Sequence, residues 1–418
     1  MLDIKFIREN TKFVLDGAKN KGIEIDTEKL LKLDEKVREL NIQVQKLREE
    51  RNKTAKAASD VVDKKNIIEK GKELKEKLEK AEKELEEKSG ELKVLLLQIP
   101  NPAKKDVKAG KNDTENEILR KVGTPKKFDF TPKDHLDLGE ALDIIDIQRA
   151  SKISGTRFYF LKNEAVLLEF ALKQFAFETL IKEGFIPVLP PVLIKTEVMK
   201  GLGYMENGGD EDMYIFEKDD LVLVGTSEQS IVAMHRDEIL TAKDLPKRYV
   251  GFSSCFRREA GSYGKDTKGI LRAHQFDKIE MVSFVKQGED DKEHDFLLSL
   301  EEKLLKALEI PYQVVKMCTG DLGFPAARKY DLEGWIPSQN KYRELTSTST
   351  TTDFQARRLG IRYKDGERTE YANILNGTAF STRPIITIME NYQQKDGSII
   401  VPEILSKWVG KDKITSKY

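Results

Sequence analysis

The chain has 418 residues, more than a single hydrophobic core usually supports, and we therefore expect two domains. Charged residues make up 34% of the chain although its formal net charge is zero, which predicts a long solvated helical element and argues against a wholly basic nucleic-acid binder. Two cysteines without CxxC spacing and four histidines without HxxxH spacing give no sign of a disulfide framework and leave a zinc site without ligands. No secretory signal or membrane-spanning apolar run is found, so we expect a cytoplasmic protein.

The first hundred residues show helical periodicity. Ile4–Lys19 predicts a short amphipathic helix that Asp3 caps and Gly22 follows. Two longer runs of apolar residues at coiled-coil spacing come next, separated by an interruption at Ser59–Asp63. Two helices of similar length with a short break predict an antiparallel hairpin over about residues 28–99, an arm of roughly 45 Å.

Basic side chains gather toward the predicted tip of this arm. They are Arg48, Arg51, Lys53 and Lys56 in the first run and Lys65 in the second. Charge runs on helices are usually solvated faces, and the apolar seam alone fits a dimerisation coiled coil or a spacer as well as it fits any binding role. A patch that binds the phosphates of a nucleic acid is the alternative interpretation.

The next segments predict a mixed α+β domain. Ala103–Lys127 has no sustained period and is expected to be a linker or surface excursion. Helices are predicted near His135–Ile153 and over Asn163–Glu183, with a strand at Phe158–Leu161 between them. The proline-rich segment Gly184–Ile194 predicts a strand at an edge or an interface.

Strand and helix patterns then alternate to the C-terminus without a regular βαβ rhythm, which favours a largely antiparallel sheet. The fold expected overall is α+β, with an N-terminal antiparallel coiled-coil hairpin before a sheet flanked by helices. We place the domains at 1–103 and 104–418.

The stretch Tyr249–Val285 predicts two strands joined by a loop rich in glycine and lysine. Alternation along a strand puts Arg257 and Glu259 on one face. The same alternation puts Arg272, His274, Phe276 and Glu280 on one face of the return strand. Guanidinium groups, carboxylates and an aromatic ring aimed at one space predict a site for an anionic, aromatic ligand.

Other polar segments could converge on this hairpin. The chain has no GxxxxGK[ST] loop, so phosphates must be bound by side chains. Thr226-Ser227-Glu228 follows a strand-like segment and offers a carboxylate for an ammonium group. Glu344 with the nearby hydroxyl of Ser347 is an oxygen pair suited to Mg²⁺. Arg383 opens a predicted helix, where the dipole disfavours a cation, and this placement predicts an anion as its partner.

Several ordered segments resemble the seryl-tRNA synthetases, a family of class II aminoacyl-tRNA synthetases. Gly184–Pro191 resembles motif 1, FRREAG with RAHQFDKIE resembles motif 2, and NGT with TR and IMENYQ resembles motif 3. The opening MLDIKFIREN and the predicted arm resemble the family's N-terminus and tRNA-binding hairpin. The resemblance spans nearly the whole chain and implies a class II catalytic domain after the arm.

The resemblance also implies an activity. It is serine–tRNA ligase activity: ATP and Mg²⁺ are used to convert L-serine to seryl-adenylate, and the seryl group is transferred to the 3′ end of tRNA(Ser), with tRNA(Sec) left open as a second acceptor. A homodimer is expected because motif 1 lies at the family's dimer interface.

The resemblance assigns site residues one by one. Arg257, Glu259 and Arg383 would be catalytic. ATP would be bound by Arg257, Glu259, Phe276, Glu344, Leu345, Thr346, Ser347 and Arg383, with Mg²⁺ at Glu344 and Ser347. Serine would be bound by Thr226, Glu228, Arg257, Glu280, Asn376 and Thr378. The tRNA would be bound by Arg48, Arg51, Lys53, Lys56 and Lys65.

Two departures and two rival functions accompany this resemblance. Many bacterial members have serine where this chain has Thr378, which keeps the hydroxyl, and the segment before Arg383 is shorter. A ligase that loads an amino acid onto a carrier protein would share the catalytic domain but would not need a basic arm. A catalytically idle tRNA-binding paralogue would be expected to have lost some of the assigned residues, and all are present.

Overall fold

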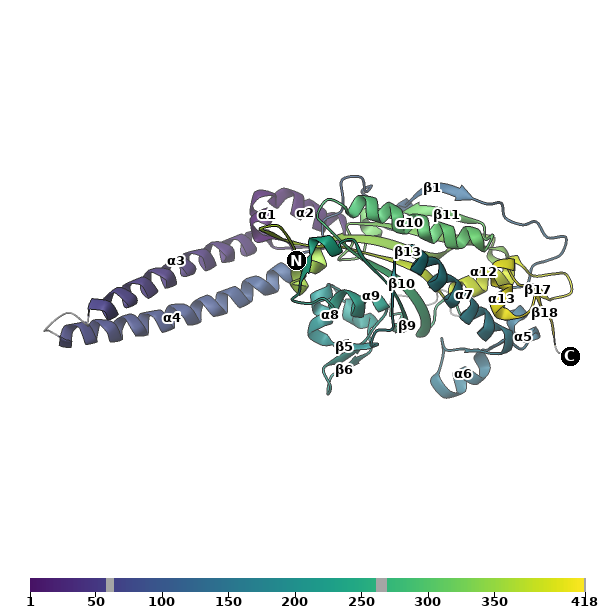
Figure 1. The fold of residues 1–418 in the computed structure, drawn as a ribbon, viewed down its shortest axis with the longest axis horizontal. Helices are drawn as coiled ribbons and strands as arrows, with labels where there is room; N and C mark the ends of the chain where they lie inside the picture. Colours follow the sequence, from purple (N-terminus) through teal and green to yellow (C-terminus); the bar gives the residue numbers. More distant parts are fainter. Residues whose placement is uncertain (58–63, 261–268, 417–418) are drawn as a thin grey trace. The chain divides into compact units, whose positions relative to one another are not determined.

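The computed structural model describes residues 1–57, 64–260 and 269–416, while the side chains of residues 57 and 64–68 lie outside that description. The chain divides into two compact units, Met1–Pro100 and Asn101–Tyr418, and each is described by itself (Figure 1). None of the helices in the described ranges is long and apolar enough to cross a membrane.

The first unit begins with two short helices rather than the single helix expected over Ile4–Lys19. The helix α1 (Ile4–Glu9) ends at Asn10, whose φ of −131° is not helical, and α2 (Thr11–Asn20) follows at once. The carboxylate of Asp3 accepts hydrogen bonds from the backbone N–H groups of Lys5 and Phe6, as expected of its capping position. The expectation of one continuous helix was therefore wrong, because the helix is broken at Asn10. The predicted cap at Asp3 is confirmed.

The predicted hairpin is present as α3 (Thr27–Ala57) and α4 (Lys64–Leu97), which run side by side in opposite directions (Figure 1). Its seam is apolar: Val44 of α3 packs with Leu78 and Ala81 of α4, and all three are buried. Such a seam stabilises two helices that are otherwise covered with charges. The expected interruption at Ser59–Asp63 lies outside the described residues.

The second unit is built on an eight-stranded sheet (Figure 1). Its strands, in order across the sheet, are β1 (Glu117–Val122), β11 (Tyr312–Lys316), β12 (Arg328–Ile336), β13 (Lys341–Thr352), β16 (Asn373–Ser381), β10 (Gln275–Val285), β9 (Lys247–Phe256) and β4 (Ile186–Val188). Every neighbouring pair is antiparallel except β4 with β9. The largely antiparallel sheet expected from the sequence is confirmed.

Both edges of this sheet bear on the sequence-based expectations. The edge strand β4 contains Pro187, which fits the rule that proline is confined to edge strands. The opposite edge, β1, lies inside Ala103–Lys127, so the expectation of an irregular linker there was wrong in part. The alternation of β1 is weak because five of its six residues carry polar or exposed side chains, and only pairing with β11 orders it.

Helices cover one face of the sheet. The helices α7 (Asn163–Lys182) and α10 (Asp290–Ala307) pack on this face and form the main core with the strands. Ile279 and Met281 of β10 point into that core. Because alternate residues of a strand face opposite ways, Phe276, Lys278 and Glu280 of the same strand face the other side. A second core that includes Val282 and Phe284 covers part of that side, and the part around Phe276–Glu280 is its open face.

The remaining elements contribute to the main core or to the second core on the other face of the sheet. The segment expected to be one helix near His135–Ile153 is instead α5 (His135–Ala141), β2 (Ile145–Asp146) and α6 (Ile147–Ser154), with β3 (Phe160–Leu161) paired to β2. The smaller elements are α8 (Thr196–Leu202), α9 (Ser227–Ala233), α11 (Phe354–Leu359), α12 (Arg383–Asn391), α13 (Glu403–Val409), β5 (Leu193–Lys195), β6 (Ile215–Phe216), β7 (Leu221–Leu223), β8 (Ile239–Thr241), β14 (Arg362–Asp365), β15 (Arg368–Tyr371), β17 (Ile399–Ile400) and β18 (Lys413–Ile414).

Candidate active site

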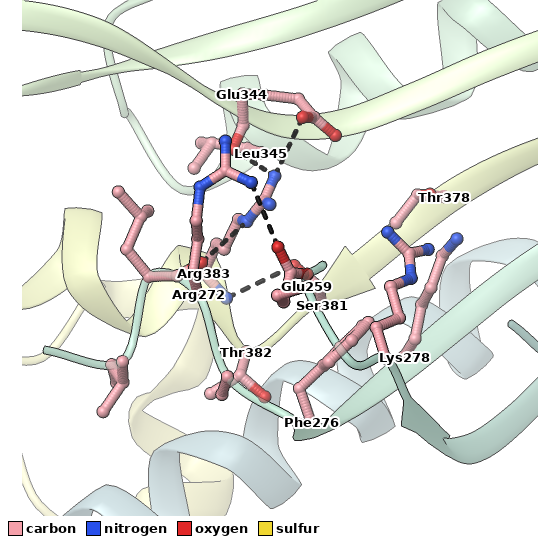
Figure 2. A pocket seen from close by; sticks show the side chains of 14 residues that line it. Glu259, Arg272, Phe276, Lys278, Glu344, Leu345, Thr378, Ser381, Thr382 and Arg383 are labelled. Atoms are coloured by element: carbon pink, nitrogen blue, oxygen red, sulfur yellow. Dashed lines mark hydrogen bonds and ion pairs between the residues drawn. The ribbon is translucent and has the colours of Figure 1, made fainter. Parts of the chain in front are cut away.

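Two adjoining cavities lie over the open face of the sheet. The first, of about 50 Å³, is lined by Glu259, Leu271, Arg272, Phe276, Leu345 and Arg383 among others (Figure 2). The second, of about 400 Å³, is lined by Tyr204, Thr226, Glu228, Glu280, Ser347 and Asn376 among others. Arg257, Lys278, Glu344 and Thr378 line both cavities. These shared residues make the two cavities parts of one site.

Strand β10 carries side chains from the first cavity into the second. Phe276, Lys278 and Glu280 follow one another on its open face. Glu280 is opposite Thr378 of β16 in the sheet register, and the Thr378 hydroxyl donates a 3.2 Å hydrogen bond to Glu280 Oε2. Both side chains are buried, so this hydroxyl and carboxylate are held in a fixed arrangement.

A second buried carboxylate, Glu228, lies in the first turn of α9. The Tyr204 hydroxyl donates to Glu228 Oε1 at 2.7 Å, and Gln355 Nε2 donates to the same oxygen at 3.1 Å. Thr226 caps this helix by accepting a hydrogen bond from the Glu228 N–H. Burial, and after it the neighbouring carboxylate of Glu280, raise the pKa of Glu228. Two carboxylates so close together are suited to an ammonium group with a hydroxyl beside it.

Arg257 lies between the cavities. Its guanidinium donates to the Gly225 carbonyl, with Nη2 at 3.1 Å, and its Cζ is 5.3 Å from the centre of the Phe276 ring. The Arg257 N–H donates to the His274 carbonyl at 3.0 Å, which closes the hairpin just beyond β9. A cation placed between an aromatic ring and a second, acid-lined cavity can bind an anionic group that reaches both cavities.

The reasoning from strand alternation was wrong for several residues of this hairpin, although most reach the site. Strand β9 ends at Phe256 and β10 begins at Gln275, so Arg257, Glu259, Arg272 and His274 all lie outside the strands. Glu259 has a φ of 53°, and its Oε2 pairs with Arg272 Nη1 at 3.1 Å across the first cavity (Figure 2). His274 lines neither cavity and lies against Phe158 instead, with ring centres 5.3 Å apart.

At the other end of the first cavity, Arg383 is the first residue of α12, as the sequence predicted. Its Nη1 lies 3.1 Å from Glu344 Oε2 and donates to the Glu344 carbonyl, and Figure 2 shows both side chains at the cavity wall. Burial acts to raise the pKa of Glu344, but Arg383 and Lys329 lower it to about 2. The ionised carboxylate of Glu344 and the hydroxyl of Ser347 are hard oxygen donors, which fit Mg²⁺.

The other two residues predicted between Glu344 and Ser347 are buried, and Leu345 packs in the main core at a register shift of β13. Leu345 lines the first cavity. The Thr346 hydroxyl donates to Glu301 Oε2 at 2.9 Å, and Thr346 lines neither cavity. Asn376, one strand away in β16, lines the second cavity.

Sequence reasoning missed three residues of the site, namely Lys278, Tyr204 and Gln355, whereas Arg272, which it aimed at the ligand, does line the first cavity. Lys278 could have been predicted from the sequence, because it lies between Phe276 and Glu280 at the same two-residue spacing. Tyr204 follows α8 and Gln355 belongs to α11, and they meet at Glu228 only through tertiary folding. No pattern in the sequence connects these two segments.

The basic residues predicted at the tip of the arm differ in their surroundings. Arg48 Nη2 is paired with Glu82 Oε1 at 2.7 Å across the hairpin, whereas Arg51, Lys53 and Lys56 are exposed. The side chain of Lys65 lies outside the described residues. Within the described part of the chain there is no group of three or more His, Cys, Asp or Glu side chains that could hold a metal ion.

Comparisons with known proteins match both units. Residues 1–103 match the family model "Seryl-tRNA synthetase N-terminal domain", and residues 214–392 match "tRNA synthetase class II core domain (G, H, P, S and T)". The serine–tRNA ligase of Thermobifida fusca is 45% identical over 416 residues, covering 99% of this chain and 98% of that protein.

Solved structures agree with this match. The seryl-tRNA synthetase of Pyrococcus horikoshii, in a complex with ATP, is similar with a TM-score of 0.93 at 39% identity and covers 100% of both chains. The cytoplasmic serine–tRNA ligase of Naegleria fowleri, in a complex with AMP, has a TM-score of 0.89 at 31% identity and covers 100% of this chain and 99% of that one.

Proposed function

Because the chain belongs to the seryl-tRNA synthetase family, the serine–tRNA ligases of class II, we propose that its two joined cavities hold serine and ATP during activation. The enzyme is an aminoacyl-tRNA synthetase that attaches serine to tRNA at the expense of ATP. One observation carries the assignment of the site: Glu280 and Thr378 form a buried pair able to bind a hydroxyl, next to an arginine shared with a second, ring-lined cavity.

The second cavity is assigned to serine. Glu228, with Thr226 beside it, receives the substrate ammonium group, and Glu280 with Thr378 receives the side-chain hydroxyl, while Asn376 completes the wall. A site built to hydrogen-bond a hydroxyl rejects alanine, because its buried polar groups are left unpaired when that hydroxyl is missing. The methyl group of Thr378 fills space without removing the hydroxyl.

The first cavity is assigned to the nucleotide. Phe276 offers a ring face for the adenine, Glu259 an acceptor for its amino group, and Arg383 a cation for the γ-phosphate. Leu345 lines the same wall, and Thr346 follows it in β13. Arg272 forms an ion pair with Glu259, so the Glu259 carboxylate would have to accept from both Arg272 and the adenine amino group. Glu344 and Ser347 would hold Mg²⁺, which supplies positive charge to the phosphates.

The reaction needs positioning rather than a protein nucleophile. The serine carboxylate attacks the α-phosphorus, a bond forms between them, and pyrophosphate leaves in line. A ribose hydroxyl of the 3′-terminal adenosine then attacks the seryl carbonyl, and AMP leaves with the electron pair of the broken bond. Arg257, which reaches both cavities, stabilises charge on the α-phosphate while the second cavity fixes the carboxylate for attack.

The arm of α3 and α4 is assigned to tRNA(Ser), with Arg48, Arg51, Lys53, Lys56 and Lys65 as the predicted phosphate contacts. Exposure supports Arg51 and Lys53 most directly, and the pairing of Arg48 with Glu82 makes it a weaker candidate. A cytoplasmic location follows from the task of charging tRNA for translation.

We also propose that the chain forms a homodimer whose interface lies at the edge of the sheet around β4. Leu189 is 78% exposed directly after this strand, and Phe170 of α7 is 62% exposed. Large apolar side chains in one region of a surface mark an interaction site. Sedimentation at micromolar concentration should give twice the mass of one chain, and Leu189→Lys together with Phe170→Lys should reduce it to one.

Exchange of labelled pyrophosphate into ATP tests the proposed function. Serine should stimulate exchange in the purified chain and the other standard amino acids should not, and serine should then be transferred to tRNA(Ser). Absence of serine-dependent exchange would overturn the proposal and favour an idle paralogue. Exchange followed by loading of a carrier protein instead of tRNA would favour the carrier-protein ligase.

A further inference from the structure

Lys278 is a buried cation inside the site to which none of the roles above has been given. Its Nζ lies 2.7 Å from Glu280 Oε2 and donates a 3.2 Å hydrogen bond to the Thr226 hydroxyl. Only 11% of its side chain is exposed, and it lines both cavities. One ammonium group therefore contacts two side chains assigned to serine, one from β10 and one from the start of α9.

The two carboxylate oxygens of Glu280 have different surroundings, because Lys278 contacts only one of them. Lys278 Nζ and the Thr378 hydroxyl both use Oε2, at 2.7 and 3.2 Å. The other oxygen, Oε1, then has a direction fixed by these two contacts. In Figure 2 the Lys278 side chain extends toward Thr378, which is where such a fixed carboxylate is needed.

The charges in the second cavity make Lys278 necessary in another way. Glu228 and Glu280 are 3% and 1% exposed, and two neighbouring carboxylates at such burial repel one another unless a cation is close. Lys278 and Arg257 line the same cavity and place positive charge near these two carboxylates, with Lys278 in direct contact with Glu280.

We propose that Lys278 is a specificity-determining residue of the serine pocket, which fixes Glu280 and Thr226 so that Glu280 Oε1 accepts the hydroxyl of serine. The inference rests on the proposed function and deepens it. Without the ammonium group, Glu280 can rotate or turn to Thr378 with either oxygen, and the difference between serine and alanine becomes smaller. Discrimination on a hydroxyl depends on buried polar groups that have no alternative partner.

Replacing Lys278 by methionine removes the charge and keeps the length of the side chain. In Lys278→Met, serine-dependent pyrophosphate exchange should show a KM for serine raised about 10- to 100-fold, while the KM for ATP stays within about threefold. The ratio of kcat/KM for serine to that for alanine should fall about tenfold. Lys278→Arg, which keeps a cation, should restore part of that ratio.

The pH dependence of the serine KM is a readout that a purely structural role would not move. Burial and the charge of Glu280 raise the pKa of Glu228, while the hydrogen bonds from Tyr204 and Gln355, and after them the charge of Lys278, lower it. In Lys278→Met that pKa rises further, so more of the Glu228 carboxylate is protonated as the pH falls. As the pH falls, the KM for serine of the variant should therefore rise more steeply than that of the unaltered chain.

Lys286→Met is the matched control, because Lys286 directly follows β10 and pairs with Asp365 at 3.1 Å outside the cavities. It should leave both KM values unchanged. An unaltered serine-to-alanine ratio in Lys278→Met, or equal losses for serine and ATP with a lowered Tm, would overturn the inference and leave the proposed function intact. If Lys278→Met does not fold, Lys278→Gln is measured with the same two outcomes. Loss of serine-dependent exchange in the unaltered chain would overturn the proposed function itself.

Discussion

The arm and the cavities are made of the same charged residue types in opposite surroundings. In the arm, the paired side chains of Arg48 and Glu82 are 57% and 39% exposed, whereas those of Lys278 and Glu280 in the cavities are 11% and 1% exposed. Exposed pairs contribute about 0–1 kcal/mol and can be exchanged for others. Buried charges need a fixed partner, and removing one partner disrupts the geometry of the rest. We therefore expect binding by the arm to depend on the sum of its charges, and binding in the cavities to depend on the position of each charged atom.

The sharpest contrast is expected at Arg257, a single cation of the site. Arg257→Ala should lower the rate of serine-dependent exchange about a thousandfold, since one lost donor at a developing charge costs about that much. The neighbouring Arg258→Ala is the matched control, because Arg258 is exposed and its Cζ lies 5.7 Å from the Tyr214 ring centre. Similar losses in both variants would show that the site depends on general charge and would remove the contrast with the arm.

A smaller effect is expected when two charges of the arm are reversed together. Arg51→Glu combined with Lys53→Glu should raise the KM for tRNA about tenfold and make the salt dependence of tRNA binding less steep, because phosphate contacts release counterions. Serine-dependent exchange should stay as it was. Lys12→Glu with Lys19→Glu applies the same change of charge to exposed lysines of α2 in the same unit. If the two double variants raised the KM for tRNA equally, the effect would come from the net charge of the unit and not from the position of the charges on the arm.

The smallest effect concerns stability. Burial raises the pKa of Glu169 on α7 to about 7, although Lys173 Nζ lies 3.4 Å away. Between its ordinary pKa of 4.5 and the raised pKa of about 7, Glu169 is protonated in the folded chain and ionised in the unfolded chain. The free energy of unfolding therefore falls as the pH rises from 4.5 to about 7. Glu169→Gln should remove this loss and stabilise the chain by up to about 3 kcal/mol at pH 8, and much less at pH 5, in thermal unfolding.

The arm supplies the control for that measurement. Glu82→Gln breaks the exposed pair with Arg48 and should change stability by less than about 1 kcal/mol at either pH. A larger change at Glu82 than at Glu169 would contradict the distinction between exposed and buried charges.

The sequence predicted the parts of the fold that repeat. The apolar seam of the arm and the alternation along β10 are periodic, so their geometry follows from spacing alone. The break at Asn10 and the edge strand β1 have no such period, and only packing or pairing decides them. At the site, resemblance to a family located most residues, but alternation failed for Glu259, whose φ of 53° takes it out of any strand. Gln355 reaches Glu228 from a different helix, which spacing cannot predict.

Deleting the arm tests the division between the two regions most directly. The deletion would run from about Leu30 to Leu97, where α3 and α4 begin and end beside one another, with a short glycine-rich connection in their place. Serine-dependent pyrophosphate exchange and serylation of tRNA(Ser) would be measured on the same preparation. We predict exchange within about threefold of the full chain and charging reduced at least about a hundredfold, because phosphate contacts supply much of the affinity for nucleic acids. Loss of both activities to the same extent would contradict the account.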